Sequence, residues 1–166
     1  IMTALLTLEA IGRGELDLNT EITVDAAALA DITEDSSTAN LQAGEKITVK
    51  NLLYCLLLAS ANEAANVLAM AVSGDIPTFV ELMNQRAQEL GMAGTHFVNP
   101  HGLHNADHYS TARDMAKIAL ACYANSTYRR IADTASYRLP ATELHPARTI
   151  TTTNKLLQPA SGYYRS

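Results

Sequence analysis

The chain has 166 residues, 48% of them hydrophobic and 17% charged, and a formal net charge of −5. This length and hydrophobic fraction suit one folded domain with a buried core and exclude a disordered segment. The acidic balance, without any run of Lys or Arg, argues against binding to nucleic acid or to an anionic membrane surface, because both require basic patches. No apolar run approaches the roughly 20 residues of a membrane-spanning helix.

The sequence of the first half of the chain predicts three helices and one pair of short strands. Apolar residues at helical spacing indicate helices, and strict alternation of apolar and polar residues indicates strands. In chain order, the expected elements are a helix over residues 1–11, strands over 21–24 and 46–49, and helices over 48–58 and 61–72. The two strands are expected to pair, and the polar stretch between them is expected to form a surface loop.

The second half predicts more helix and one further strand pair. A helix over residues 77–90 has a proline in its first turn, where proline is tolerated. Another helix opens at Thr111, and Thr111-x-x-Asp114 resembles a capping box. Its predicted core face consists of Met115, Ile118, Ala119 and Cys122. A short helix over residues 127–132 is followed by an antiparallel pair of strands over 136–139 and 148–153.

These elements predict a mostly α-helical fold with small antiparallel β elements. No internal repeat or low-complexity linker divides the chain, so residues 1–166 are expected to form a single unit. Cys55 and Cys122 both fall in apolar helical patterns, and we expect buried free thiols, since an unpaired cysteine packs as a small hydrophobic residue.

The joint between the helices over 48–58 and 61–72 carries the triplet Ser60-Ala61-Asn62, followed by Glu63. One interpretation is a capping box, in which the Ser60 hydroxyl accepts from a free helix N–H and Glu63 reaches back. The other is catalytic: the hydroxyl bonds a neighbouring lysine and relays a proton to a leaving group. Asn62 would then offer a donor and an acceptor to a substrate peptide bond. The two interpretations are compatible, because a cap holds its residue rigidly.

Five segments, in order along the chain, resemble the serine D-alanyl-D-alanine carboxypeptidases, the low-molecular-mass penicillin-binding proteins. They are Met2-Thr3-Ala4-Leu5-Leu6, residues 49–71, residues 94–103 (Gly-Thr-His-Phe-Val-Asn-Pro-His-Gly-Leu), residues 109–115 (Tyr-Ser-Thr-Ala-Arg-Asp-Met) and Asn154-Lys155-Leu156-Leu157. The resemblance implies the β-lactamase/transpeptidase-like α+β fold, of which this chain would be the helical portion.

The family carries three motifs, Ser-x-x-Lys, Ser-x-Asn and Lys-Thr-Gly, and only the second occurs in this sequence. By resemblance, we expect Ser-x-x-Lys immediately before Ile1 and Lys-Thr-Gly after Ser166. Nucleophilic catalysis requires an activated hydroxyl beside a base. We therefore expect the chain as printed to be catalytically inactive, although the complete protein is an acyl-transfer enzyme.

The resemblance also implies what the complete protein does. A serine attacks the penultimate D-Ala carbonyl of a peptidoglycan stem peptide, terminal D-Ala leaves, and water hydrolyses the acyl-enzyme. Ser60 is implied as a catalytic residue, and the implied substrate-binding residues are Asn62, His101, Leu103 and Asp114. No metal and no cofactor is implied. The implied setting is extracytoplasmic, at the cell wall and the outer face of the cytoplasmic membrane, with β-lactams as inhibitors.

Two alternatives stay open from the sequence. A class A β-lactamase needs a general-base Glu on a loop after the Ser-x-Asn helix, and the absence of any carboxylate from residues 95–105 favours the carboxypeptidase. A non-catalytic cell-wall-binding or structural relative is not ruled out by any residue in the chain. The spacing His101-x-x-His104-x-x-x-His108 lies in a turn-rich segment, whereas zinc proteases place such ligands on one helix face, so a metal site is not expected.

The resemblance has one structural consequence. Without the main sheet of the family, the apolar faces of the helix over residues 1–11 and of residues 52–58 are expected to be exposed. Large exposed apolar patches promote association, so a dimer, a swapped assembly or poor solubility is expected.

Overall fold

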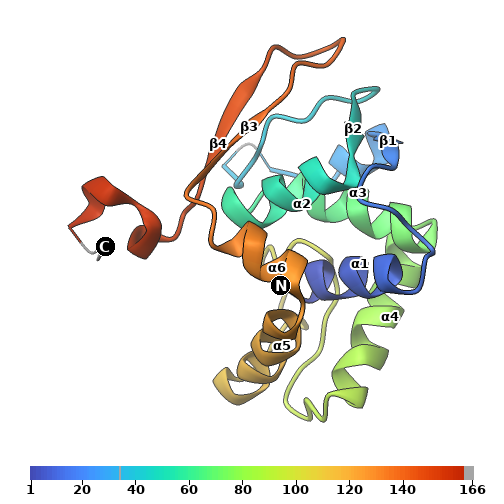
Figure 1. Cartoon of the computed structure of the whole chain (residues 1–166). Coiled ribbons are helices and arrows are strands. Elements are labelled where there is room, and N and C mark those ends of the chain that lie inside the picture. The colour runs from blue at the N-terminus through green and yellow to red at the C-terminus, as the bar shows by residue number, and fades with distance from the viewer. Residues whose placement is uncertain (34, 163–166) are drawn as a thin grey trace.

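The computed structural model describes residues 1–33 and 35–162, and helices predominate within them (Figure 1). The α-helices are α1 (Met2–Gly12), α2 (Val49–Leu58), α3 (Asn62–Ser73), α4 (Ile76–Glu89), α5 (Ala112–Ala124) and α6 (Ser126–Ala132). The antiparallel strand pairs are β1 (Glu21–Thr23) with β2 (Lys46–Thr48) and β3 (Ser136–Leu139) with β4 (Arg148–Thr151). The 3-10 helices are η1 (Ala26–Leu29), η2 (Lys155–Leu157) and η3 (Pro159–Ser161). The mostly helical class and both strand pairings are thus confirmed.

Helix starts follow the capping residues in the sequence. Thr48, Asp75, Thr111 and Asn125 each accept a backbone N–H of the first turn of α2, α4, α5 and α6. Such a side-chain cap satisfies a backbone donor that has no partner inside the helix. The observed helix bounds agree with the expected ones to within one or two residues, and in α2, α4, α5 and α6 these caps fix the first residue of the helix.

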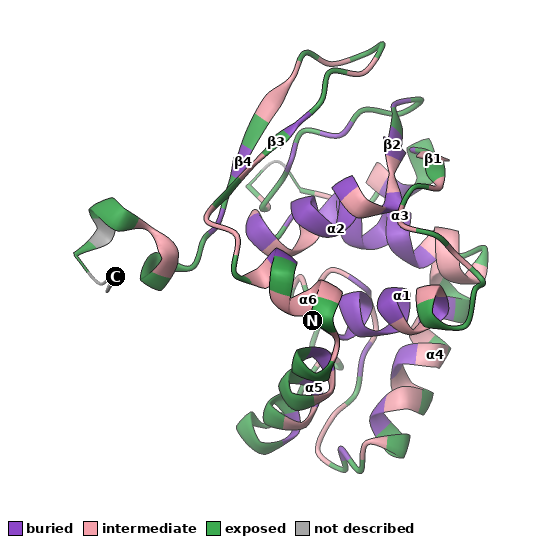
Figure 2. Ribbon diagram, in the orientation of Figure 1, coloured by how far each residue is buried: buried purple, intermediate pink, exposed green. Residues whose placement is uncertain are grey.

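Helix α3 lies at the centre of the fold and packs against α1, α2 and α4. All of its first eight residues, from Asn62 to Ala69, are buried. The helix is rich in alanine, so neighbouring helices approach it closely, and Figure 2 shows α1, α2 and α3 largely in the colour of buried residues. The triplet Ser60-Ala61-Asn62 therefore leads directly into a helix whose first two turns are buried.

The β3–β4 hairpin is attached to the body by a buried ion pair. Glu45, which directly precedes β2, has a fully buried side chain, and its Oε1 accepts from Arg148 Nη2 of β4 at 3.0 Å. Beside this pair, the rings of Tyr54 on α2 and Tyr137 on β3 stack with centroids 3.6 Å apart. The end of β4 continues against α2, where the Thr153 N–H donates to the Leu58 carbonyl at 2.9 Å. The hairpin thus passes close to the end of α2.

The expected exposure of the first helix is wrong. Met2, Leu5 and Leu8 are each at most 3% exposed, because α1 contacts every other α-helix of the described chain. Residues 52–58 are likewise mostly buried, with Leu52 and Leu58 at 0% exposure. The sheet is therefore not required to cover these helices. Association of the chain remains a prediction, but these helices do not supply the surface for it.

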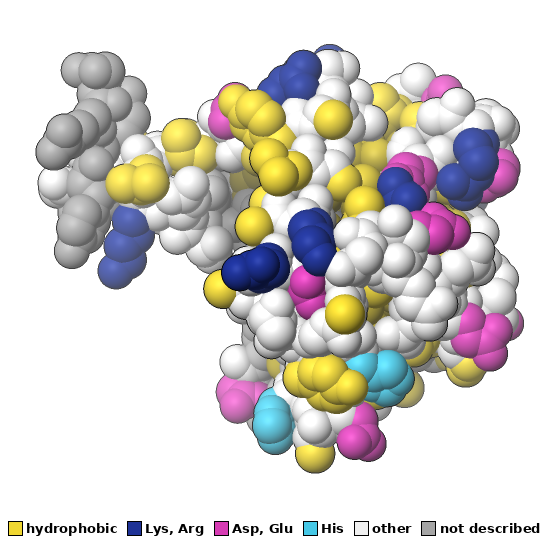
Figure 3. Space-filling model, turned by 90° about the horizontal axis from the view of Figure 1, so that it is seen from below, with side chains coloured by type: hydrophobic (Ala, Val, Ile, Leu, Met, Phe, Trp, Pro, Cys, Tyr) yellow, Lys and Arg dark blue, Asp and Glu magenta, His cyan; other side chains and the backbone are white. Residues whose placement is uncertain are grey.

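Helix α5 exposes apolar side chains instead, and its predicted core face was partly wrong. Ile118 and Cys122 are buried as expected, whereas Met115 and Ala119 are exposed. The third buried residue is Asp114, which takes the place expected for Met115. A prediction from hydrophobicity alone would not place a charged residue on the buried face. Large hydrophobic side chains exposed on this helix are Met115, Leu120 and Tyr123. In the view from below, hydrophobic side chains lie among charged and histidine side chains (Figure 3).

Both cysteines are buried and unpaired, as expected. Burial raises the pKa of the Cys55 thiol to about 12 and that of Cys122 to about 11, so both stay protonated and unreactive near neutral pH. None of the helices in residues 1–33 and 35–162 has the length and hydrophobicity required to cross a bilayer.

Candidate active site

Ser60 occupies a strained joint between α2 and α3. Its φ is +57°, in the left-handed region that residues other than glycine rarely adopt. The Cys55 carbonyl accepts from both Ala59 N–H and Ala61 N–H at 3.2 Å, so the chain turns sharply and exposes Ser60. A left-handed conformation costs a non-glycine residue about 1–2 kcal/mol. Such a cost at an exposed polar residue points to use of its side chain.

The capping-box interpretation of Ser60 is wrong. The residue that caps α3 is Ala61, which has no side-chain acceptor. An N-cap residue has an extended backbone, and the left-handed Ser60 lies one position outside it. Glu63 does not reach back either, because its carboxylate is held by a different segment.

Asn62 and Ser60 have side chains that remain unpaired. Asn62 is only 6% exposed, and its backbone N–H donates to the Ser37 carbonyl at 2.9 Å. In the part of the chain that the structure describes, neither the Asn62 amide nor the Ser60 hydroxyl has a hydrogen-bond partner. Neither polar atom of the Asn62 amide is among the fully buried, unpartnered atoms of the described residues, so the amide still reaches the surface. The arrangement leaves a donor, an acceptor and a hydroxyl available for a ligand.

Glu63 holds a loop over the first turn of α3. Its Oε1 accepts from the Thr38 hydroxyl and the Ala39 N–H at 2.7 Å each, and from the Leu41 N–H at 3.4 Å. Glu63 is 2% exposed, so these bonds are shielded from water. The sequence carries one signal for this role, which is that Glu63 is the only charged residue of α3.

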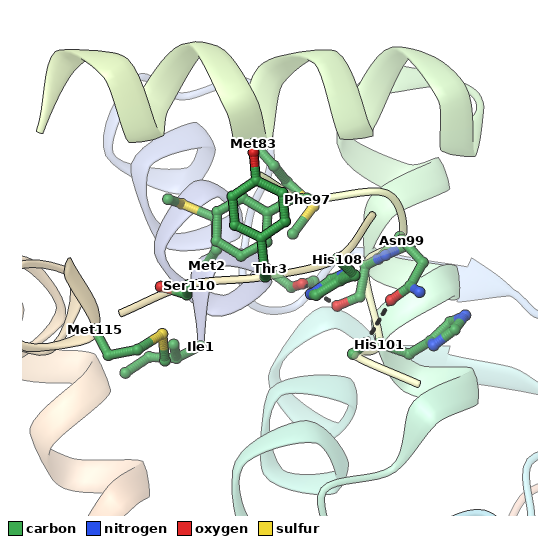
Figure 4. A pocket seen from close by; sticks show the side chains of 13 residues that line it. Ile1, Met2, Thr3, Met83, Phe97, Asn99, His101, His108, Ser110 and Met115 are labelled. Atoms are coloured by element: carbon green, nitrogen blue, oxygen red, sulfur yellow. Dashed lines mark hydrogen bonds between the residues drawn. The ribbon is translucent and has the colours of Figure 1, made fainter. Parts of the chain in front are cut away.

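His101 lies in a turn that is tied to α1 and lines a pocket (Figure 4). The Thr3 hydroxyl donates to the Pro100 carbonyl at 2.5 Å, and Asn99 Oδ1 accepts from Gly102 N–H at 2.6 Å. The pocket has a volume of about 270 Å³ and extends from Met2 and Thr3 of α1 to this turn. Both ring nitrogens of His101 are engaged, Nε2 with Asp31 Oδ2 at 3.0 Å and Nδ1 as acceptor from Leu103 N–H at 3.1 Å.

Leu103, the next predicted substrate-binding residue, is half-buried at the end of the same turn. Its carbonyl accepts from the Asn99 side chain at 3.0 Å. The backbone polar groups of Leu103 are thus used within the turn, and its side chain is the part available to a ligand.

Asp114 is placed on another part of the molecule, as a brace between α5 and the preceding loop. Its Oδ2 accepts from Gly94 N–H and the Thr95 hydroxyl, both at 2.9 Å, and Oδ1 lies 3.2 Å from Lys117 Nζ. The loop approaches α5 so closely that a Cβ on Gly94 would lie 2.7 Å from Thr111 Cγ2. Thr111 caps the helix as expected, but the carboxylate serves the loop rather than the cap.

These bonds set the charge state of Asp114. Burial alone would raise the pKa of the carboxyl, but hydrogen bonds from Thr95, Gly94 and Lys117 outweigh it and hold the pKa below its ordinary value. A lowered folded-state pKa stabilises the fold at every pH above the unfolded-state pKa, about 3.9. That stabilisation is lost as the pH falls through the folded-state pKa.

Replacement of Asp114 by Asn is therefore expected to destabilise the chain at neutral pH and to flatten its acid-induced loss of stability. The urea midpoints of variant and unmodified chain should differ most near neutral pH and converge below about pH 4. Asp133→Asn, at an exposed residue, is the matched control. A gap that stays constant over this range would contradict the assigned bonds.

The histidines of residues 101–108 do not converge. The His101 ring contacts Asp31, whereas His108 Nδ1 accepts from Val98 N–H at 3.3 Å. Within the described ranges, no three side chains of His, Cys, Asp or Glu lie close enough together to hold a metal ion.

The family-level comparison and the individual relatives point to the same protein family. A family-level comparison matches residues 1–161 to the D-alanyl-D-alanine carboxypeptidases, peptidase family S11. The carboxypeptidase DacF of Bacillus subtilis is 39% identical over 119 residues, which cover 72% of this chain and 30% of the relative. The D-alanyl-D-alanine carboxypeptidase of Streptomyces sp. strain K15 is 35% identical over 98% of this chain and 58% of its own length.

Solved structures agree with the fold. The crystal structure of the Streptomyces K15 DD-transpeptidase superposes with a TM-score of 0.81 at 32% identity, covering 97% of this chain and 66% of that one. An evolved penicillin-binding protein homologue from Mycobacterium tuberculosis gives 0.80 at 34% identity, covering 95% and 57%. The transpeptidase-like fold is thus confirmed, and the chain spans between about a third and three fifths of the curated relatives' length. On this evidence, the chain belongs to the D-alanyl-D-alanine carboxypeptidase family S11.

Proposed function

We propose that the protein to which this chain belongs is a D-alanyl-D-alanine carboxypeptidase, which removes terminal D-Ala from peptidoglycan stem peptides through an acyl-serine intermediate. The observation that carries the proposal is the pair of unpaired side chains at the joint of α2 and α3. Ser60 holds an exposed hydroxyl on a strained backbone, and the amide of the largely buried Asn62 has no hydrogen-bond partner in the described chain.

In this proposal the two side chains have different roles. The Asn62 amide accepts from and donates to the peptide bond of the substrate, since its oxygen is an acceptor and its NH₂ group a donor. The Ser60 hydroxyl hydrogen-bonds a lysine and passes a proton to the nitrogen of the departing D-Ala, which is general acid catalysis. We assign the nucleophilic serine and this lysine to residues outside the 166, because the printed sequence contains no Ser-x-x-Lys.

The turn over residues 99–103 supports the carboxypeptidase over a β-lactamase. Residues 95–105 contain no carboxylate, so they supply no general base for rapid hydrolysis of the acyl-enzyme. The polar atoms of Asn99 and His101 are bonded within and around the turn. His101 is accordingly proposed to shape the wall of the site, with the Leu103 side chain contacting substrate, and Asp114 to hold the loop at Gly94 and Thr95 that leads into the turn.

The proposed substrate sets the location and the inhibitors. Peptidoglycan stem peptides lie outside the cytoplasmic membrane, so we propose that the protein works there, at the cell wall. β-Lactams carry an acyl group that a nucleophilic serine attacks, and we propose them as inhibitors of the complete protein.

The test uses the natural protein containing this chain together with the 166-residue chain. Each is incubated with a tripeptide ending in D-Ala-D-Ala and, separately, with a fluorescent penicillin. We expect the natural protein to release D-Ala and to retain one covalently bound penicillin by mass spectrometry, and the 166-residue chain to do neither.

Each other outcome selects an alternative. Absence of D-Ala release and of penicillin adduct from the natural protein would indicate a non-catalytic relative. Rapid turnover of penicillin would indicate a β-lactamase. A penicillin adduct on the 166-residue chain would show that a nucleophile lies within it.

A further inference from the structure

Asp31, just after η1, links two segments that are distant in sequence. Its Oδ1 accepts from Asn66 Nδ2 of α3 at 2.7 Å, and its Oδ2 lies 3.0 Å from Nε2 of His101, which is 70 residues away. The His101 side chain is 4% exposed, whereas that of Asp31 is 52% exposed. The Asp31 carboxylate therefore lies at the surface and forms hydrogen bonds with two buried side chains, those of Asn66 and His101.

The bonds of His101 determine its tautomer. Nδ1 accepts from the Leu103 N–H at 3.1 Å, so Nδ1 carries no proton. A proton on Nδ1 would set two donors against each other. Nε2 must then carry the proton, and its N–H donates a hydrogen bond to Asp31 Oδ2. With both nitrogens used in this way, the ring has no atom left to serve as a general base or to bond a substrate.

The orientation of Asn66 follows from the same reasoning. Its Nδ2 donates to Asp31 and also to the Ala28 carbonyl at 3.0 Å. Rotating the amide by half a turn would place its oxygen against two acceptors. In the observed orientation, Oδ1 is buried without a partner among the described residues, and the two bonds that Nδ2 donates offset the cost of its desolvation.

Asp31 is the residue type that this position requires. Both groups that face it, Asn66 Nδ2–H and His101 Nε2–H, are donors, and a carboxylate offers an acceptor oxygen to each. An asparagine has one acceptor oxygen, and its amino group would face a donor. Asp31→Asn therefore breaks one of the two bonds while conserving shape.

We propose that Asp31 is a positioning residue, which clamps the turn over residues 99–103 to α3 one helical turn beyond Asn62. Resting on the proposed function, the inference is that this clamp holds the turn, with the proposed substrate-binding Leu103, in a fixed position relative to the Asn62 amide. The clamp acts through His101 and Asn66 and touches no substrate itself. Its loss should weaken substrate binding more than it slows the chemical step.

The first test needs only the 166-residue chain labelled with ¹⁵N. Long-range ¹H–¹⁵N spectra report which nitrogen of each histidine carries a proton. We expect His101 to be protonated at Nε2 alone in the unmodified chain. In Asp31→Asn we expect both tautomers, together with hydrogen exchange at the Leu103 amide that is about tenfold faster or more, since one lost hydrogen bond of about 1.4 kcal/mol is a factor of ten.

Asp133→Asn makes the same charge change at an exposed site and should alter neither signal. Asp31→Glu, which keeps two acceptor oxygens on a longer side chain, should restore the single tautomer in part. A proton on His101 Nδ1 in the unmodified chain, or unchanged spectra in Asp31→Asn, would overturn the clamp whatever the activity of the protein.

The second test uses the natural protein and a peptide ending in D-Ala-D-Ala. Asp31→Asn is expected to raise KM about tenfold with kcat changed less than about threefold, the pattern of lost uniform binding. A fall in kcat with unchanged KM, or no kinetic effect, would refute the positioning role. If the unmodified natural protein releases no D-Ala, the proposed function fails while the tautomer experiment still decides the clamp.

Discussion

Replacement of Ser60 by glycine is expected to stabilise the fold and, at the same time, to disable the activity that we propose for the complete protein. The left-handed backbone at Ser60 costs about 1–2 kcal/mol with a side chain and little in glycine. Part of this gain is offset because glycine makes the unfolded chain more flexible, by about 0.4–1 kcal/mol. Ser60→Ala keeps the strain and removes the same hydroxyl. Ser60→Gly should therefore be more stable than Ser60→Ala by about 1 kcal/mol.

Although Ser60→Gly and Ser60→Ala should differ in stability, both should lose activity in the complete protein. Both variants lack the hydroxyl that we propose as a proton relay, and general acid–base catalysis contributes about 10²–10⁴-fold to rate. The measurements are urea unfolding of the 166-residue chain and acylation of the natural protein by a D-Ala-D-Ala peptide. If Ser60→Gly proved less stable than Ser60→Ala, the strain would be absent. If either kept full activity, the relay would be refuted.

Replacement of Arg148 by methionine is expected to destabilise the chain by about 3–5 kcal/mol, because it leaves a buried carboxylate without its cation. The Glu45 side chain is 0% exposed and that of Arg148 is 12% exposed. Glu45 also accepts from Gln42 N–H at 3.1 Å and from the Thr142 hydroxyl at 3.2 Å, so it cannot turn toward water without losing both. Free energies of unfolding for small domains are about 5–15 kcal/mol, and the loss is thus a large share of the total.

The pair as a whole is expected to contribute little net stability. Arg148 Nε and Nη1 are buried without partners in the described chain, so the desolvation of the guanidinium is only partly offset. The double variant Glu45→Gln/Arg148→Met removes both charges and keeps an acceptor for Gln42 N–H. It should recover more than half of the loss, measured by urea unfolding as a double-mutant cycle.

A matched control comes from the same hairpin. Arg138 is exposed on β3, and Arg138→Met should change stability by less than about 0.5 kcal/mol. A loss below about 1 kcal/mol for Arg148→Met would show that the ion pair does not hold the hairpin. Because Thr153 N–H bonds the Leu58 carbonyl near the Ser60 joint, a released hairpin should also raise hydrogen exchange at Thr153.

Local signals in the sequence were sufficient for the secondary structure. Caps such as Thr48 and Thr111 and the proline at position 77 act within a few residues, and their effect is therefore readable from neighbouring letters. The same holds for the strand pairs, where alternation predicts a strand and the register follows from it. The family resemblance rests on such contiguous segments, and the comparisons confirmed it.

Errors arose where a partner decided which face of an element is buried. The buried face of α5 includes Asp114 because Gly94 and Thr95 supply donors for its carboxylate. Exposure of Met115 on the neighbouring face follows from that choice. Similarly, Ser60-x-x-Glu63 satisfies the pattern of a capping box, yet Glu63 finds better partners in the loop over residues 38–41. A local sequence pattern shows which hydrogen bonds a side chain could form with its neighbours. It does not show the partners from distant segments that compete for the same side chain.

The sequence alone determined the family, the mostly helical class and the position of the Ser60-x-Asn62 triplet at a helix joint. Only the tertiary structure separated the candidate site residues by role. Ser60 and Asn62 keep unpaired polar groups, whereas His101 and Asp114 use theirs to hold loops in place. The physical reason is the range of the interactions: caps and periodicity act between near neighbours, while the bond between His101 and Asp31 joins residues 70 positions apart and exists only once the chain has folded.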